Sequence, residues 1–289
     1  MKLYTLELDG IRKIAVGTAE GKAVTLDKLG VEAADMNELI MKWDDCEEKI
    51  KEGLSSCSDE NTVNLDDVKV LAPIPEPRQD VVCLGVNYRE HFEETQDGIN
   101  FVKQADTVYF SKRVNRSNDP GGVIPNYDFV DSLDYETELG VVLKKDALGV
   151  SEADAPNYIL GYTIINDVSA RNVQKRHQQW YLGKSLDGYT PMGPCIVTAD
   201  ELGDPHDLRI SCYVNGEKRQ NSSTKLMITT VEKAISELSQ GMMLKAGTVI
   251  ATGTPGGVGM GMKPPVFLKS GDVVRCEIEG IGVLENVVE

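Results

Sequence analysis

The chain has 289 residues, of which 41% are hydrophobic and 26% charged, a composition typical of a globular protein with a sizeable core. Its 46 acidic residues against 30 lysines and arginines give a formal net charge of −16, which disfavours binding to nucleic acid or to anionic membranes. The three histidines are far apart in the sequence, so a metal site is expected to use oxygen ligands.

Cysteine usage and the N-terminal residues bear on the cellular compartment. The six cysteines include no Cys-x-x-Cys pair, and most lie in apolar stretches, which predicts reduced and buried thiols. The first residues lack the apolar core of a signal peptide, and no apolar run is long enough to span a membrane. The sequence therefore predicts a cytoplasmic protein.

The first part of the chain predicts a hairpin followed by a helix. Two short β-prone runs, 2–8 and 11–17, flank Asp9-Gly10, a hairpin signal because glycine readily adopts positive φ. Residues 33–53 carry apolar side chains at helical spacing, which indicates an amphipathic helix.

A cluster of prolines marks an expected domain junction. Three prolines between residues 72 and 79 restrict the backbone to extended forms. We therefore expect a small N-terminal α/β domain, residues 1–72, and a larger domain, residues 73–289.

Beyond the junction the pattern is mainly β. The few expected helices are chiefly 87–94, 168–180 and 228–240. Runs rich in β-branched residues predict strands at 81–86, 107–111, 138–144, 158–165, 194–198, 208–214, 247–252 and 272–287. This arrangement predicts an α+β, mainly β fold with a closed or folded-over sheet rather than a doubly wound one.

An acidic segment is the first candidate for chemistry. On a strand, Glu136 and Glu138 would project from the same face about 7 Å apart. Two carboxylates this close repel each other unless a cation lies between them. The residues alone leave two interpretations open: a metal site, or an acidic strand face in solvent.

A second candidate follows an apolar strand that is expected to end at Asn166-Asp167, where a helix begins. Asp167 could supply a functional carboxylate at the end of the strand, or it could simply cap the helix. Arg171 and Gln174 follow by four and seven residues, a spacing that would place them on the face of Asp167 and in one pocket.

A third candidate is a short expected helix, with Asn87 as its cap, in which His91 and Glu94 lie three residues apart. Glu94 could hold the imidazole in one tautomer, as a general base requires. An inert pair on the surface is the alternative. The glycine-rich segments around Lys184 and Thr254 match neither a P-loop nor a dinucleotide-binding motif, and by spacing alone they predict turns.

Seven stretches, in this order, resemble the fumarylacetoacetate hydrolase family from about Pro73 to the C-terminus. They are GVNYREH (85–91), DYETEL (134–139), NDVSAR (166–171), GKS (183–185), VNGE (214–217), IATGTP (250–255) and EIEGIG (277–282). The resemblance implies a mixed β-sandwich or β-roll, a Mg²⁺ or Mn²⁺ ion and a homodimer. Residues 1–72 are similar to the small N-terminal domain of many bacterial members.

The resemblance also implies roles for individual residues. The metal ligands would be Glu136, Glu138 and Asp167. Lys184 would steady an enolate, while His91 and Glu94 would activate water. The substrate would contact Arg171, Gln174, Gly253 and Thr254.

The resemblance implies a 2-oxo acid or diketo acid substrate and a metal-bound enolate. We interpret the chain as a hydrolase of a carbon–carbon bond in acylpyruvate- or fumarylpyruvate-type 1,3-diketo acids. Oxaloacetate decarboxylation and isomerisation of 5-carboxymethyl-2-hydroxymuconate-type substrates are alternatives on the same centre. A binding or scaffold protein, with residues 1–72 as the interaction module, is a further alternative. Residues 95–106 are expected to shape the distal part of the pocket.

Overall fold

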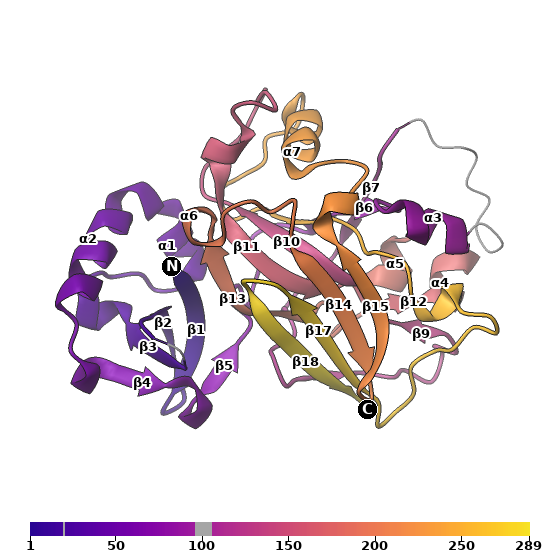
Figure 1. Ribbon diagram of the computed structural model, residues 1–289, viewed down its shortest axis with the longest axis horizontal. Helices are drawn as coiled ribbons and strands as arrows, with labels where there is room; N and C mark the ends of the chain where they lie inside the picture. The colour runs from indigo at the N-terminus through magenta and orange to yellow at the C-terminus, as the bar shows by residue number, and fades with distance from the viewer. Residues whose placement is uncertain (20, 96–105) are drawn as a thin grey trace.

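The computed structural model of the chain describes residues 1–19, 21–95 and 106–289 (Figure 1). In these residues β-strands predominate and helices are few, which confirms the expected α+β, mainly β fold. The strands are β1 (Lys2–Leu8), β2 (Ile11–Gly17), β3 (Lys22–Thr25), β4 (Thr62–Asn64), β5 (Lys69–Leu71), β6 (Val81–Gly85), β7 (Val108–Lys112), β8 (Val123–Ile124), β9 (Leu133–Asp134), β10 (Thr137–Leu143), β11 (Ile159–Asn166), β12 (Ser169–Ala170), β13 (Met192–Thr198), β14 (Arg209–Val214), β15 (Glu217–Ser223), β16 (Val249–Ala251), β17 (Val273–Ile278) and β18 (Gly282–Val288).

Most helices lie at the ends and edges of the sheets. The α-helices are α1 (Met36–Met41), α2 (Trp43–Ser56), α3 (Arg89–Thr95), α4 (Arg171–Arg176), α5 (Tyr181–Lys184), α6 (Ala199–Leu202) and α7 (Val231–Ser239). The 3₁₀ helices are η1 (Leu26–Leu29), η2 (Asp59–Asn61), η3 (Leu65–Asp67), η4 (Ala155–Tyr158), η5 (Thr224–Leu226) and η6 (Gly259–Gly261). No helix of the described residues is long and apolar enough to cross a membrane.

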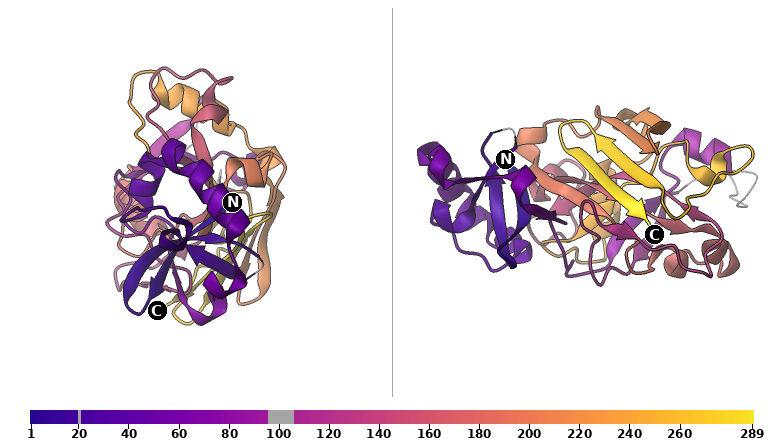
Figure 2. Two further views of the ribbon diagram at one scale, coloured as in Figure 1. Left: turned by 90° about the vertical axis from the view of Figure 1, so that its left-hand side faces the viewer. Right: turned by 90° about the horizontal axis from the view of Figure 1, so that it is seen from below.

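Two sheets pack face to face in the larger part of the chain. Within the described residues, the larger sheet has 11 strands in the order β4-β3-β2-β1-β13-β11-β10-β16-β6-β7, with β5 also paired to β1. The smaller sheet has five, in the order β15-β14-β17-β18-β8. Figure 1 shows the small sheet in front of β10 and β11, and Figure 2 shows the N-terminal strands and helices at one end of the molecule.

Strand β10 is buried on both of its faces, which explains its almost continuous apolar sequence. Leu139 and Val141 belong to the core between the two sheets, whereas Val142 belongs to a second core that includes Ile40 of α1. Because successive side chains on a strand point to opposite faces, Glu138 lies on the same face as Val142. A carboxylate at this position is therefore inside the protein.

The N-terminal residues share the large sheet with the rest of the chain. Strands β1 and β2 form the expected hairpin around Asp9 and Gly10, both with positive φ. Strand β1 also pairs with β13, where Lys2 lies opposite Val197. The division of the chain at residue 72 stays a prediction, and any boundary there is crossed by backbone hydrogen bonds.

Three expected elements differ in the structure. The helix over 33–53 divides into α1 and α2 because Lys42 leaves helical geometry (φ −105°, ψ 12°), which lets Ile40 and Trp43 both become buried. The strand over 272–287 divides into β17 and β18 at a turn containing Gly280, whose φ is 79°. The helix over 168–180 shortens to α4, since Ser169 and Ala170 pair with β9 as strand β12.

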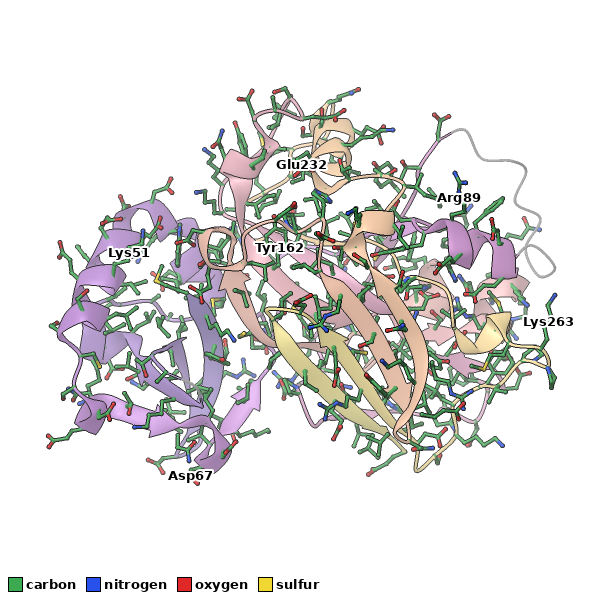
Figure 3. All side chains as sticks on the ribbon, viewed as in Figure 1. Lys51, Asp67, Arg89, Tyr162, Glu232 and Lys263 are labelled. Carbon is green, nitrogen blue, oxygen red and sulfur yellow. The ribbon has the colours of Figure 1, made fainter. Side chains whose placement is uncertain are left out.

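The expectation for the cysteines is confirmed. All six are free, and each except the partly exposed Cys57 is buried. Charged side chains such as Asp67 and Lys263 are exposed at the periphery of the molecule (Figure 3). The acidic excess is therefore largely a surface property, and the exception is a small group of buried acids near strands β10 and β11.

Candidate active site

Buried charge is concentrated in one place. Every aspartate, glutamate, lysine and arginine that is buried in the described residues belongs to a single cluster at the ends of β10 and β11. Its members are Lys112, Asp134, Glu136, Glu138, Asp167, Arg171 and Lys184. Buried ionised groups are costly unless they are paired or bind a metal, so this concentration indicates a functional site.

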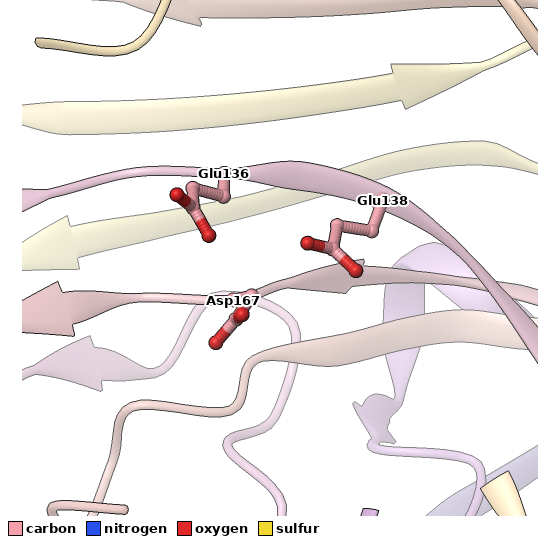
Figure 4. Close-up of side chains that lie close together, drawn as sticks. All are labelled: Glu136, Glu138 and Asp167. Carbon is pink, nitrogen blue, oxygen red and sulfur yellow. The ribbon is translucent and has the colours of Figure 1, made fainter. Parts of the chain in front are cut away.

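Antiparallel pairing brings the three candidate metal ligands together. Thr137 at the start of β10 lies opposite Asn166 at the end of β11. The Asn166 side chain accepts a hydrogen bond from the backbone amide of Glu136 (3.0 Å), and the amide of Asp167 donates to the carbonyl of Glu136 (2.8 Å). One carboxylate oxygen from each of Glu136, Glu138 and Asp167 lies within 4.8 Å of the others. Figure 4 shows the three carboxylates close together. The alternative of an acidic strand face in solvent is wrong.

Two lysines compensate part of this negative charge. Lys184 Nζ bridges Glu136 Oε2 (2.5 Å) and Asp167 Oδ2 (2.6 Å). Lys112, whose side chain is fully buried, donates to Asp167 Oδ1 and to the carbonyl of Tyr189 (2.7 Å). Asp167 is thus held from both sides by ammonium groups. The sequence analysis assigned no role to Lys112, and its one signal is a lysine at the end of a strand-forming run.

The pKa shifts show which carboxylate lacks compensation. Burial alone raises the pKa of Glu136, but Arg171 and Lys184 outweigh it, so the pKa lies below its usual range. The pKa of Lys184 is raised, because Asp167 and Glu136 outweigh the opposing effect of burial. Burial, together with the neighbouring charges of Asp167 and Glu136, raises the pKa of Glu138 well above its usual value.

The residues present fit a divalent metal ion. In the part of the chain that the structure describes, no ion pair involves Glu138, whose carboxylate accepts a hydrogen bond from the amide of Gly253 (2.8 Å). A buried carboxylate without a cation is unfavourable, and a cation placed among the three carboxylates would compensate it. Oxygen ligands of this kind suit a hard ion such as Mg²⁺ or Mn²⁺.

His91 and Glu94 of α3 form the expected pair. Nδ1 of His91 lies 2.8 Å from Oε1 of Glu94, and its Nε2 lies 4.0 Å from Oε1 of Glu136. The imidazole is buried, 6% exposed, so the alternative of an inert surface pair does not describe it. Asn87 does not cap this helix; its side chain bonds instead to the backbones of Thr229 and Thr252.

Arg171 and Gln174 also lie in the cluster, although not by way of a capped helix. Asp167 is followed by strand β12, and α4 begins only at Arg171 with no side-chain cap, so the alternative that Asp167 simply caps a helix is wrong. Nη2 of Arg171 donates to Glu136 Oε1 (2.5 Å), and Nη1 donates to Gln174 Oε1 (3.2 Å). Both side chains are at least 97% buried, at 2% and 3% exposed.

The segment after β16 completes one side of the site. Beyond its contact with Glu138, Gly253 has φ 90°, and a Cβ there would lie 2.8 Å from Cβ of Asn87, so glycine is required. Thr254 Oγ1 donates to the carbonyl of Thr137 (3.0 Å) and accepts from the side-chain amide Nε2 of Gln220 (2.7 Å). Gln220 is fully buried, lies in a polar strand and carries no sequence signal.

A small pocket opens onto the cluster. Its apolar wall includes Phe110, Trp180 and Met260. A Cβ on Gly85 would lie 2.4 Å from the Trp180 ring, so the chain passes directly against the indole. The polar lining residues are His91, Glu136, Glu138, Asp167, Arg171, Gln174, Lys184 and Thr254. The expectation that residues 95–106 shape the distal part falls mainly on residues 96–105, which lie outside the described residues.

Comparisons with known proteins agree with this fold and identify the family. Residues 80–289 match the model of the family described as fumarylacetoacetate (FAA) hydrolase C-terminal. The chain belongs to the fumarylacetoacetate hydrolase family.

Individual members of the family differ in the activity that their names state. The oxaloacetate tautomerase YisK of Bacillus subtilis is 42% identical over 226 residues, which is 78% of this chain and 74% of that protein. The structure of a fumarylacetoacetate hydrolase from Exiguobacterium antarcticum matches with 39% identity and a TM-score of 0.84, covering 100% and 99% of the two chains. A 2-hydroxyhepta-2,4-diene-1,7-dioate isomerase from Mycobacterium marinum matches with 32% identity and a TM-score of 0.75, covering 100% and 98%.

Membership of the family establishes the broad class of this protein. Fumarylacetoacetate hydrolase family enzymes act on small organic acids and use a divalent metal, and the relatives include proteins named as hydrolases, tautomerases and isomerases. The chain is therefore an enzyme of this family with a buried carboxylate group that could bind such a metal. The specific reaction is a separate question.

Proposed function

We propose that the protein is a divalent-metal-dependent enzyme that interconverts the keto and enol forms of oxaloacetate. The observation that carries the proposal is the placement of the His91 imidazole, Nε2 inward, next to a buried carboxylate group with one uncompensated negative charge. Support also comes from the activities for which relatives are named, among them the oxaloacetate tautomerases of Bacillus subtilis and Xenopus laevis.

The reaction requires proton movement without net hydrolysis or oxidation. In the keto form a base removes one proton from C3, the C3–H electron pair becomes the C2–C3 double bond, and the C2 carbonyl oxygen receives a proton. We assign the C3 proton transfer to His91, which Glu94 keeps in one tautomer through its 2.8 Å contact with Nδ1. Lys184, charged because its pKa is raised, would donate a hydrogen bond to the developing enolate oxygen.

The remaining residues would bind the substrate. A divalent cation held by Glu136, Glu138 and Asp167 would supply positive charge that stabilises the enolate. Gly253 and Thr254 would lie beside the carboxylate next to C2, and Arg171 with Gln174 would face the distal carboxylate at C4. The small pocket, with Phe110, Trp180 and Met260 in its wall, would limit the access of water to the reacting carbon.

Proton exchange in D₂O tests this proposal. Purified protein with Mn²⁺ is mixed with oxaloacetate, and deuterium incorporation at C3 is followed by NMR alongside the ultraviolet absorbance of the enol. We expect both rates to exceed those of Mn²⁺ alone. A protein that binds Mn²⁺ yet accelerates neither would contradict the proposal. Pyruvate release above the metal-only rate would instead indicate decarboxylation.

Hydrolysis of an acylpyruvate or fumarylpyruvate is a second candidate, favoured by the intact pair of His91 and Glu94. In that reaction the same base would deliver water to the distal carbonyl, and the enolate of pyruvate would leave. Pyruvate released from acetylpyruvate in the presence of Mn²⁺ would support it. Acceleration of C3 exchange without such release favours the tautomerase.

Three further properties stay predictions. They are a Mg²⁺ or Mn²⁺ ion in the site, a homodimer and a cytoplasmic location. Light scattering tests the homodimer directly, since a monomeric mass would contradict it. Thermal unfolding in parallel Mg²⁺ and Mn²⁺ titrations compares the two metals.

A further inference from the structure

Asp134 is a fully buried carboxylate that lies beside the site without facing the pocket. It ends strand β9, where it pairs with Ser169 of β12, two residues before Arg171. Its Oδ2 accepts a hydrogen bond from Nε of Arg171 (2.9 Å). The two groups form a buried ion pair, with side-chain exposures of 0% and 3%.

Three backbone amides occupy the rest of this carboxylate. Oδ1 accepts from Tyr135 (3.0 Å) and Gly259 (2.7 Å), and Oδ2 also accepts from Met260 (3.0 Å). Together with Arg171, these four donors fill the ordinary acceptor capacity of a carboxylate. Asp134 is therefore committed to protein contacts and has no free lone pair for a metal or a substrate.

The consequence for Arg171 is a defined orientation. Its Nε is fixed by Asp134, while Nη1 and Nη2 face Gln174 and Glu136. A guanidinium group is planar, so a bond at Nε sets the plane in which both terminal nitrogens lie. Asp134 thus determines where Arg171 presents its N–H groups to the pocket.

The turn that holds Asp134 also holds the partner of the imidazole. The amide of Gly257 donates to Oε2 of Glu94 (2.8 Å), two residues before the amide that donates to Asp134. A Cβ on Gly259 would lie 2.7 Å from Oδ1 of Asp134, so this close approach requires glycine. The turn at 257–260 therefore ties the arginine side of the pocket to the histidine side.

We propose that Asp134 is a positioning residue: it orients Arg171 toward the distal carboxylate of a 2-oxo dicarboxylic acid and anchors it to the turn that holds Glu94. The inference rests on the proposed function, in which Arg171 faces that carboxylate. According to this inference, Asp134 contributes to substrate specificity although its side chain does not line the pocket.

Asp134→Asn tests the inference, because an asparagine offers one oxygen and one N–H₂ group to four N–H donors. Whichever way the amide turns, two donors lose their acceptor. We expect KM for oxaloacetate to rise by about tenfold or more, with a smaller change in kcat. Inhibition by oxalate, which has no distal carboxylate, and Mn²⁺ affinity measured by calorimetry should stay within about twofold.

Arg171→Lys supplies the second arm, since it keeps the charge but lacks Nε. If Asp134 acts through Arg171, adding Asp134→Asn to Arg171→Lys should raise KM no further. Asn286→Ala, on β18 of the smaller sheet, is the control: it removes partly buried hydrogen bonds to the carbonyls of Asp119 and Gly122, away from the pocket lining, and should leave KM unchanged.

The outcomes separate the inference from the proposed function. Additive increases in KM, equal losses of oxaloacetate and oxalate binding, or an unchanged KM in Asp134→Asn would each overturn the inference while the wild-type protein remains active. An inactive wild-type protein would overturn both. Should Asp134→Asn not fold, Arg171→Lys alone decides: a tenfold increase in KM with unchanged oxalate inhibition supports the inference, and wild-type values overturn it.

Discussion

The carboxylate of Glu138 accepts a 2.8 Å hydrogen bond from the backbone amide of Gly253, while both of its acidic neighbours are paired with cations. Glu136 contacts Arg171 and Lys184, and Asp167 contacts Lys112 and Lys184. The buried cluster thus holds four carboxylates and three basic side chains, and Glu138 carries the unbalanced charge. This imbalance predicts how the protein responds to metal and to substitution.

Glu138→Gln should stabilise the metal-free protein. The substitution keeps the shape of the side chain and removes a charge that burial and two neighbouring acids disfavour. We expect the free energy of unfolding without metal to increase by about 1–3 kcal/mol, measured by urea denaturation in EDTA. The same variant should lose the stabilisation by Mn²⁺. A variant that is less stable without metal would contradict this account of Glu138.

Mn²⁺ or Mg²⁺ should raise the melting temperature of the wild-type protein. A ligand that binds only the folded state at one hundred times its dissociation constant adds about 2.7 kcal/mol to the free energy of unfolding. Calorimetric melting curves with and without metal measure the effect, and EDTA should reverse it. NaCl at equal ionic strength is the control. Equal melting temperatures in metal and in NaCl would show that the carboxylates do not bind the ion.

Lys112→Met should destabilise the protein strongly. The ammonium is fully buried and contacts Asp167, so its removal leaves a buried carboxylate with one fewer cation. We expect a loss of about 3–5 kcal/mol in urea denaturation. Lys245→Met is the matched control, because that lysine pairs with Asp146 at the surface and its loss should cost less than about 1 kcal/mol. Similar losses in the two variants would contradict a structural role for Lys112.

His91→Asn should slow proton exchange without affecting metal binding. Removing a positioned general base lowers rates by about 10²–10⁴-fold. Deuterium incorporation at C3 of oxaloacetate measures the rate, and calorimetry measures the affinity for Mn²⁺. The control is His206→Asn, which breaks a similar 2.8 Å contact, with Glu232, outside the pocket lining. An exchange rate above one tenth of the wild-type value would exclude His91 as the base.

Gly261→Ala should disturb the same pair indirectly. A Cβ there would lie 2.5 Å from Cδ of Glu94, so the end of this side chain must leave its present position beside His91. If the contact of Glu94 with His91 is lost, kcat should fall by about tenfold in a protein that remains folded. Gly241→Ala, where nothing lies within 4 Å, should behave as wild type. Unchanged kcat in both variants would show that the position of Glu94 is not critical.

Local patterns were sufficient for much of the fold. The alternation in β1 and β2, the apolar run of β10 and the turn at Asp9-Gly10 depend on residues close in sequence, and the expected strands formed there. Strand β15 was missed because its sequence, EKRQNSS, has no apolar alternation and is extended through pairing with β14. The helix break at Lys42 was missed because it depends on which side chains the sheet can bury.

Some features of the site could likewise be predicted from local sequence, and others depended on the tertiary structure. The sequence by itself determined the family, the three candidate carboxylates and the His91–Glu94 pair, since each is carried by a short motif. Only the tertiary structure decided that Lys112 contacts Asp167 and that Asp134 holds Arg171. These contacts join residues 55 and 37 positions apart, and no local spacing encodes them. Burial in the tertiary structure is also what makes these carboxylates unusual. In solvent their charges would be hydrated, whereas inside the protein they need cations to compensate them.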